Sequence, residues 1–313
     1  MIIIKDIKMT QNSEKTIIFF NSVPGRIVSH LIAVLFTLSG VWLFQNRPIL
    51  SSKTISITPD PINLERYDKE QPINYSANTV EADKQLAIEQ FNKNDIQAGK
   101  KAVESLLNRG AFREAKAALK IVLKAGNNEQ NVDSDILFLQ GRLIWELAQY
   151  GNRNYTVDEA IYYWEKAVAQ LPDSIPYQNA IGFAYYTKGD LKKAYDSWLK
   201  VLKLSGEIAP ETQILRNISI EALPTPEVEQ KDAINAYAGI GLVMMKSAQT
   251  YQGNEQRERW LRALQYRTKV MKEAAIEYHI PQLRQNWLWS REALRDWDFL
   301  MRTDWNILQK RTN

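Results

Sequence analysis

Apolar and small residues recur at helical spacing throughout residues 155–207, and most regularly within 177–200. There the pattern forms two short segments, which are joined at Lys188-Gly189-Asp190. Helical spacing on both sides of a glycine-containing break predicts a pair of antiparallel helices. Because one such pair cannot bury its apolar face alone, we expect further pairs to pack on either side of it.

The same helical spacing continues over most of the chain from Thr79 onward. The regular alternation of apolar and polar residues that is typical of strands is not found in this part of the sequence. Short stretches rich in Gly, Asn and Pro interrupt the helical pattern at residues 92–95, 108–110, 126–128, 150–154, 171–173, 189–190, 205–206, 218–226, 252–254 and 280–281. The pattern therefore predicts an all-α array of helix pairs over residues 80–279.

The most regular helix pair carries a distinct set of small and aromatic residues. Gly182 and Ala194 would let the two helix axes approach closely, while Tyr185 and Trp198 would fill the space towards the neighbouring pair. This arrangement resembles one tetratricopeptide repeat. The resemblance implies a helix-turn-helix solenoid, in which the first helix of each repeat lines an inner groove that binds a partner peptide.

Neighbouring stretches resemble the same repeat less closely. The resemblance is clear over residues 135–206 and weak over 80–278. The unit before the best one has about seven extra residues between its helices, and the unit after it has Arg267 where an aromatic side chain is usual. The matching positions in these units are Leu137, Gly141, Ile144, Ala160, Trp164, Ala167, Pro172, Tyr237, Ile240, Gly241, Met244 and Ala263, with more degenerate matches at Ala87, Asp95, Gly99, Val103, Ala115 and Leu119. The alternative is a generic helical bundle with a coincidental spacing of Gly and Ala.

The resemblance also implies which side chains would face the groove. These residues stand beside the packing positions of each first helix, and they are Phe138, Arg142, Trp145, Asn179, Phe183, Tyr186, Asn235, Leu242 and Met245. Repeats that clamp a terminal carboxylate use Lys, Arg and Asn at these places, and only three of the nine are of that kind. An apolar and aromatic groove favours an amphipathic helix or an apolar segment as ligand. We expect Asn179, Phe183 and Tyr186 to be exposed for partner contact; the alternative for each residue is packing against the next helix.

Residues 27–44 contain no Lys, Arg, Asp or Glu. As a helix they would extend about 27 Å, close to the thickness of a bilayer core. We therefore expect residues 1–26 to form a tail and residues 27–45 a single transmembrane helix, with a cleaved signal peptide or a buried core helix as alternatives. Four basic residues precede the segment, which favours a cytoplasmic amino terminus and repeats on the other side; the reverse orientation stays open.

Two further segments flank the predicted repeats. Residues 46–79 contain four prolines and no sustained apolar period, which predicts an extended linker. Residues 280–313 carry four tryptophans interleaved with charged residues, at Trp287, Trp289, Trp297 and Trp305. We interpret 280–313 as a capping helix whose rings cover the last repeat, with an aromatic partner-binding site as the alternative.

Composition excludes several classes of site. The chain of 313 residues contains no cysteine, so disulfides, thiolate metal sites and cysteine nucleophiles are excluded. The net charge is +4, and residues 1–45 account for half of it with four basic and two acidic residues. The repeat region is therefore almost neutral and shows no basic stripe, which argues against nucleic-acid binding.

Recognisable catalytic motifs are absent from the sequence. It contains no glycine-rich phosphate loop, nucleophile elbow or His-Glu-x-x-His pattern, and His279 is the only histidine outside the predicted membrane segment. Paired carboxylates occur at Asp158-Glu159, at Asp133 with Asp135, and at Asp296 with Asp298. We expect no enzyme activity, no metal and no cofactor, and predict a membrane-tethered scaffold that binds a partner protein. The alternatives are an enzyme or glycan-acting accessory with an unrecognised carboxylate site, and a structural protein that self-associates through its Trp-rich end.

Overall fold

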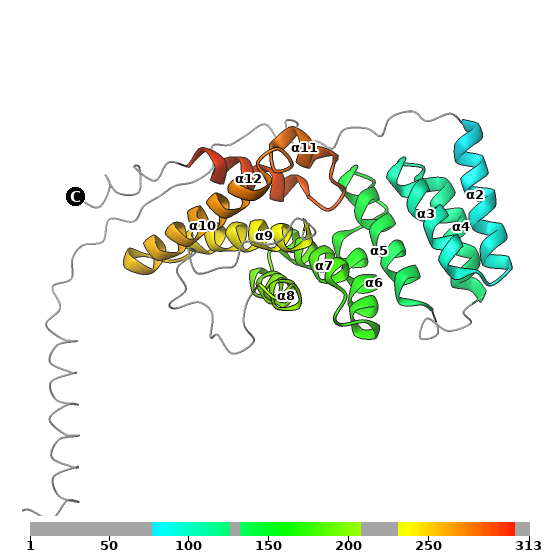
Figure 1. Cartoon of the computed structure of the whole chain (residues 1–313), viewed down its shortest axis with the longest axis horizontal. Helices are drawn as coiled ribbons and strands as arrows, with labels where there is room; N and C mark the ends of the chain where they lie inside the picture. Colours follow the sequence, from blue (N-terminus) through cyan, green and yellow to red (C-terminus); the bar gives the residue numbers. More distant parts are fainter. Residues whose placement is uncertain (1–76, 126–131, 208–230, 304–313) are drawn as a thin grey trace, which may run out of the picture. The chain divides into compact units, whose positions relative to one another are not determined.

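In the computed structural model, residues 77–125, 132–207 and 231–303 are described, and within these ranges the chain is all-helical, without strands. The helices are α2 (Ala77–Asn92), α3 (Ile96–Asn108), α4 (Phe112–Ala125), α5 (Ser134–Gln149), α6 (Val157–Gln170), α7 (Ile175–Lys188), α8 (Leu191–Leu204), α9 (Lys231–Ala248), α10 (Gly253–Ala274), α11 (Ile280–Gln285) and α12 (Arg291–Arg302) (Figure 1). The predicted all-α class is confirmed for this part of the chain.

Local sequence explains where the best-predicted helix pair begins and ends. Helix α7 ends at Gly189, whose φ of 87° lies in the left-handed region that favours glycine. Helix α8 begins directly afterwards, because the Asp190 side chain accepts a hydrogen bond from the backbone N–H of Lys193. The predicted turn at residues 188–190 is therefore confirmed.

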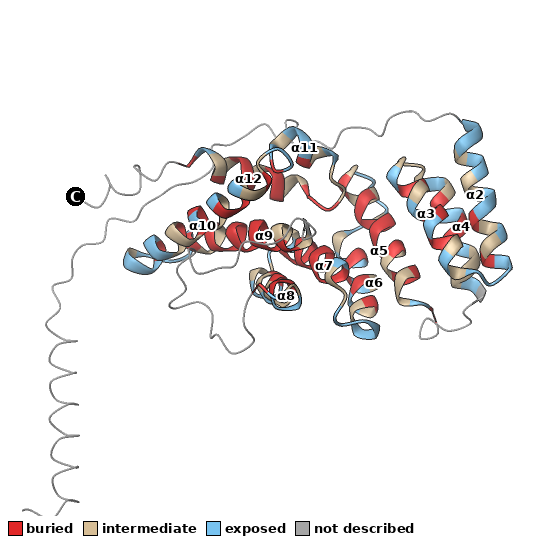
Figure 2. Ribbon diagram, viewed as in Figure 1, coloured by how far each residue is buried: buried red, intermediate tan, exposed pale blue. Residues whose placement is uncertain are grey.

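Successive helices pack in the manner of a solenoid. The pairs α5–α6, α7–α8 and α9–α10 are each packed together, and α4, α6 and α8 also contact the first helix of the following pair. Helix α2 packs on both α3 and α4. Helices α7 and α9 are buried along most of their length (Figure 2). Neighbouring pairs therefore supply the burial that a single helix pair lacks.

Glycines allow the closest approaches between the helices. A methyl group placed on Gly182 would lie 2.7 Å from the indole nitrogen of Trp198, and one on Gly141 would lie 2.5 Å from the Trp164 ring. The glycine of each first helix thus lets the second helix approach closely, as predicted for Gly182, and the group that it meets is the tryptophan of that second helix. Trp198 also covers Gly239 of α9, so its ring fills the space between two successive pairs.

The third pair differs from the predicted pattern. Gly241 faces Tyr266 of α10, which stands one residue before the position where an aromatic side chain was expected. Arg267 points elsewhere: its guanidinium donates hydrogen bonds to the backbone carbonyls of Leu300 and Thr303, at 2.9 and 2.7 Å. The departure at Arg267 thus reflects a contact with the end of α12.

The predicted tail, membrane helix and nearly all of the linker lie outside the described residues. Helix α2 begins at Ala77, so the last three residues of the predicted linker are helical. Among the helices of 77–125, 132–207 and 231–303, none is both long and apolar enough to cross a bilayer. Trp305 also lies outside these ranges.

Residues 280–303 form two helices rather than the single capping helix that was predicted. The break follows from local hydrogen bonds: the Asn286 side chain accepts from the N–H of Leu288, and the Ser290 hydroxyl accepts from the N–H of Ala293 at the start of α12. Residues 286–290 are therefore irregular, which lets the chain change direction between α11 and α12.

Candidate partner-binding groove

Seven of the nine predicted groove residues are buried, and Phe138 and Asn235 are half-buried. The side chains of Asn179, Phe183 and Tyr186 are 1%, 0% and 0% exposed, so the expectation that they are exposed is wrong. Residues 278–303, which we call the C-terminal segment, fold back over one face of α5, α7 and α9. We call that face the groove face. The segment covers Phe183 and Tyr186, whereas Asn179 is buried between α7 and α9.

Trp287 covers the groove face at α5. The Trp145 indole N–H donates to the backbone carbonyl of Trp287 at 2.9 Å, and the Arg142 guanidinium lies 4.5 Å from the centre of the Trp287 ring. Arg142 is also held within the helical array, because it forms an ion pair with Glu146 at 2.8 Å and donates to the Asn108 side chain of α3 at 2.7 Å. Two of the predicted residues thus hold one tryptophan from the C-terminal segment.

Trp289 and Ser290 cover the groove face at α7. The centres of the Phe183 and Trp289 rings are 5.0 Å apart, within the range of favourable aromatic pairs. One turn further along α7, the hydroxyls of Thr187 and Ser290 are hydrogen-bonded at 2.8 Å. This part of the contact is therefore mainly aromatic, with one polar pair at its side.

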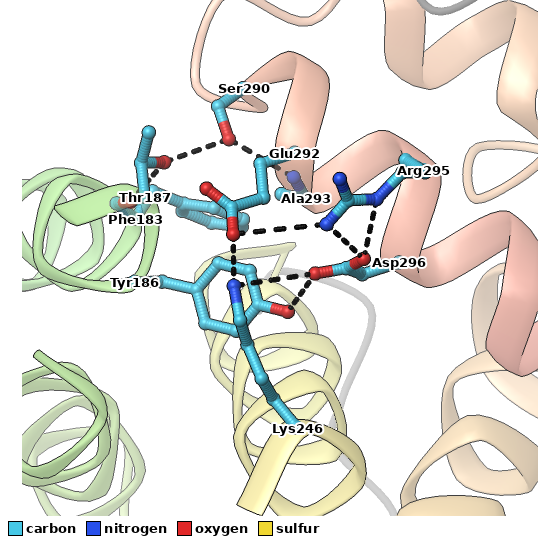
Figure 3. Close-up of polar contacts among 9 residues, drawn as sticks. All are labelled: Phe183, Tyr186, Thr187, Lys246, Ser290, Glu292, Ala293, Arg295 and Asp296. Atoms are coloured by element: carbon cyan, nitrogen blue, oxygen red, sulfur yellow. Dashed lines mark hydrogen bonds and ion pairs between the residues drawn. The ribbon is translucent and has the colours of Figure 1, made fainter. Parts of the chain in front are cut away.

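A polar cluster around the buried side chains of Tyr186 and Asp296 joins α7 and α9 to α12 (Figure 3). The Tyr186 hydroxyl donates to Asp296 at 2.6 Å, and Lys246 forms ion pairs with Glu292 and, at 3.7 Å, with Asp296. Arg295 also pairs with Asp296 at 2.7 Å, so two cations balance two carboxylates. Burial, followed by the nearby Asp296 charge, raises the pKa of Tyr186 well above its usual value, so this phenol stays protonated and donates.

The remaining predicted residues play different parts. Asn235 accepts a hydrogen bond from the Tyr278 hydroxyl at 2.8 Å, where the C-terminal segment begins. Asn179 donates to the backbone carbonyl of Asp232 at 3.0 Å, which ties α7 to α9. Leu242 and Met245 are fully buried in the hydrophobic core. These last two side chains thus follow the alternative of packing between helices.

No protein-family model matches this chain, and no curated protein matches it significantly.

Several residues that contact the C-terminal segment were not predicted from the sequence, among them Thr187, Lys246 and Arg267. Arg267 carried a signal, because it stands where an aromatic side chain was expected. Thr187 and Lys246 carried none, since each is an ordinary polar residue near the end of its helix. Their partners lie 103 and 46 residues away in the sequence.

Helix α3 meets the groove face at Asn108, which accepts a hydrogen bond from Arg142, and Arg142 itself lies against Trp287. Four exposed polar side chains follow one another along α3 at intervals of four, three and four residues: Gln97, Lys101, Glu104 and Asn108. We call them the open row of α3.

The candidate catalytic residues have structural neighbours. Asp135 pairs with Lys100 and accepts a hydrogen bond from Tyr177; although burial opposes it, these two donors lower the pKa of Asp135. Asp158 forms an ion pair with Lys188, Asp298 pairs with Arg302, and His279 is the exposed residue that precedes α11. Within the described ranges, no group of three or more His, Asp or Glu side chains could hold a metal ion.

Proposed function

We propose that the helical array is a protein-binding scaffold of the tetratricopeptide kind, and that its groove face receives a segment of a partner protein. The observation that carries the proposal is the occupant of that face: a polypeptide segment, residues 278–303, lies on it through ring contacts, hydrogen bonds and ion pairs. A face with aromatic rings and charges in these positions has the chemistry to recognise a peptide.

The repeat-like packing supports the tetratricopeptide assignment. Two successive pairs bring a glycine of the first helix against a tryptophan of the second, Gly141 with Trp164 and Gly182 with Trp198. In such arrays the first helices form the ligand-binding side, because each repeat contacts only its neighbours and leaves that side continuous. The groove face is formed by first helices in this scheme.

The scaffold is proposed to be tethered to a membrane through residues 27–45, with the linker of residues 46–79 between the anchor and the repeats. Tethering would raise the effective concentration of the groove for partners in the same membrane. A role in assembling a membrane protein complex would follow from that arrangement. Protease accessibility in sealed vesicles tests on which side the repeats lie.

Partner binding is tested by site-specific photo-cross-linking from the full-length protein in its native membrane. A cross-linking amino acid at Lys101 faces outward from the open row of α3, and one at Lys203 is exposed on α8, the second helix of its pair. We expect a discrete cross-linked partner from position 101 and not from position 203. The same products from both positions, or none from position 101, would count against a groove-specific scaffold.

The two other hypotheses receive less support. Self-association through the Trp-rich end would need accessible rings, but Trp289 and Trp297 are fully buried against their own chain. A carboxylate active site would need acids free to act, but Asp135, Asp158 and Asp296 are each engaged in ion pairs.

A further inference from the structure

We infer that the C-terminal segment is a releasable ligand of the groove face, and that the partner that replaces it has the same chemistry: large aromatic side chains followed by a helix with two carboxylates four residues apart. In the chain itself these features are Trp287 and Trp289, then Glu292 and Asp296. The inference rests on the proposed function, because it assigns a regulation and a partner class to the same groove.

The charges at α9 explain why the partner must be acidic. Lys246 is the cation that α9 contributes to the polar cluster. Both carboxylates that pair with it, Glu292 and Asp296, belong to the C-terminal segment. When the segment leaves, Lys246 and the Tyr186 hydroxyl lose these partners together. Once the segment leaves, both groups face water. A neutral replacement would then cover the Lys246 ammonium group without a partner, which is strongly unfavourable, whereas a replacement that brings carboxylates restores the ion pair.

At α5, by contrast, the groove face is already formed without the segment. Arg142 keeps its ion pair with Glu146 and its hydrogen bond to Asn108 whether Trp287 is present or not. Its guanidinium therefore stays in place to stack on an incoming aromatic ring. The two ends of the face thus select different features, an aromatic ring at α5 and carboxylates at α9.

The ion pair at α9 is accessible to a competing segment. The side chains of Lys246 and Glu292 are 24% and 28% exposed, so water and other carboxylates can reach this pair while the C-terminal segment is in place. Ion pairs that water reaches contribute little to stability, so this contact can be exchanged.

The connections of the segment suit its release. Residues 275–279 and 286–290 are not helical, so the chain can change direction before α11 and before α12. The segment follows the last helix pair, and the contacts among α5 to α10 do not run through it. Release would expose Phe183, Trp145 and Tyr186, an apolar surface that a partner would have to cover.

A pair of cysteines can lock the segment, because the chain contains none of its own. The hydroxyls of Thr187 and Ser290 lie 2.8 Å apart, so the full-length double variant Thr187→Cys, Ser290→Cys places two thiols within reach of a disulfide. The probe is a fluorescent peptide with the sequence of residues 284–303. We expect it to bind the reduced variant and to bind the oxidised variant at least about tenfold more weakly, as measured by fluorescence anisotropy.

Two matched controls identify the contacts. The same peptide with Glu292→Gln and Asp296→Asn should bind the reduced protein at least about tenfold more weakly, because it cannot pair with Lys246. Conversely, the full-length protein with these two substitutions has a weaker internal ligand and should bind the unchanged peptide more tightly than the parent chain does. The full-length protein with Glu258→Gln, at an exposed position of α10, should bind both peptides as the parent chain does.

The outcomes separate the inference from the proposed function. Equal binding to the oxidised and reduced forms would overturn the inference, because the peptide would then bind elsewhere. No binding to any form, including the chain with the weakened segment, would also overturn it and make the segment a permanent part of the fold. In both cases partner cross-linking from position 101 on α3 would be unaffected, so the scaffold itself would stand or fall on that separate result.

Discussion

Helix α7 has two buried faces. Trp198 of α8 contacts both of them, since its ring centre also lies 5.0 Å from that of Phe183, and the C-terminal segment covers one. On one face Gly182 meets Trp198 of the helix that follows directly, and we call this the packing face. On the groove face Phe183 and Tyr186 meet Trp289 and Asp296, more than a hundred residues further along the chain. The packing face is apolar and tightly filled, whereas the groove face also includes ion pairs. Each face holds a buried indole N–H that has no hydrogen-bond partner within the described ranges, from Trp198 and from Trp289. Burial alone therefore does not distinguish a permanent contact from an exchangeable one.

The largest expected contrast is between the tryptophans on the two faces. Trp198→Ala should lower the free energy of unfolding by about 3–5 kcal/mol, because it leaves a cavity between two helix pairs. Trp289→Ala should lower the free energy of unfolding by less. If the C-terminal segment can leave the groove face while the helix pairs stay folded, a weaker segment lowers the stability of the protein by no more than the free energy of its binding to that face. Urea denaturation measures both losses.

Amide exchange sharpens the same comparison. After Trp289→Ala, faster exchange should be confined to residues 278–303, while after Trp198→Ala it should extend through α7 to α10. Equal losses of stability, with equal and uniform exchange in the two variants, would contradict the distinction between the faces.

Arg267 tests the groove side from the far end of the segment. Arg267→Met keeps an unbranched apolar stem but removes the hydrogen bonds to the carbonyls of Leu300 and Thr303. We expect the free energy with which the C-terminal segment binds the groove face to weaken by about 1.5–3 kcal/mol, the usual contribution of a hydrogen bond from a charged donor. Exchange of the amides around residues 300–303 measures it. A loss spread evenly over α9 and α10 instead would mean that Arg267 serves the helix pair.

Gly239 tests the packing side. A methyl group on this glycine would overlap the Trp198 ring, so Gly239→Ala should destabilise the protein by about 1–3 kcal/mol through overpacking. The matched control is Ala169→Ser, at an exposed position of α6, which should stay within about 0.5 kcal/mol of the parent protein. If thermal unfolding showed no difference between the two variants, the close approach of α9 to Trp198 would be wrong.

These contacts differ in how far the sequence could predict them. Gly182, Gly189 and Trp198 were predictable, because their neighbours lie within the same helix pair and local spacing determines their roles. In the third pair Gly241 faces α10, as its place in the pattern indicated, but the contact of Gly239 with Trp198 of the preceding pair was not predicted. That contact depends on the rotation of α9 against α8, which local spacing does not determine. The burial of Phe183 and Tyr186 depended on a distant segment, for which Arg267 was the one local sign.

The smallest expected effect concerns Asp135, which links α5 to Lys100 of α3 and Tyr177 of α7. Its pKa in the folded protein is below the usual 3.8, although burial opposes the shift, because Lys100 and Tyr177 stabilise the ionised form. A lowered pKa means that the stabilisation is fully present above pH 3.8 and is lost as the pH falls towards the folded value. Since the Asp135 side chain is 43% exposed, we expect less than about 1 kcal/mol. Asp135→Asn should therefore unfold at a lower temperature than the parent protein at pH 6, with a gap that narrows towards pH 3, whereas Glu277→Gln, at an exposed position, should follow the parent curve. A gap that stayed constant with pH would assign the role of Asp135 to its hydrogen bonds and not to its charge.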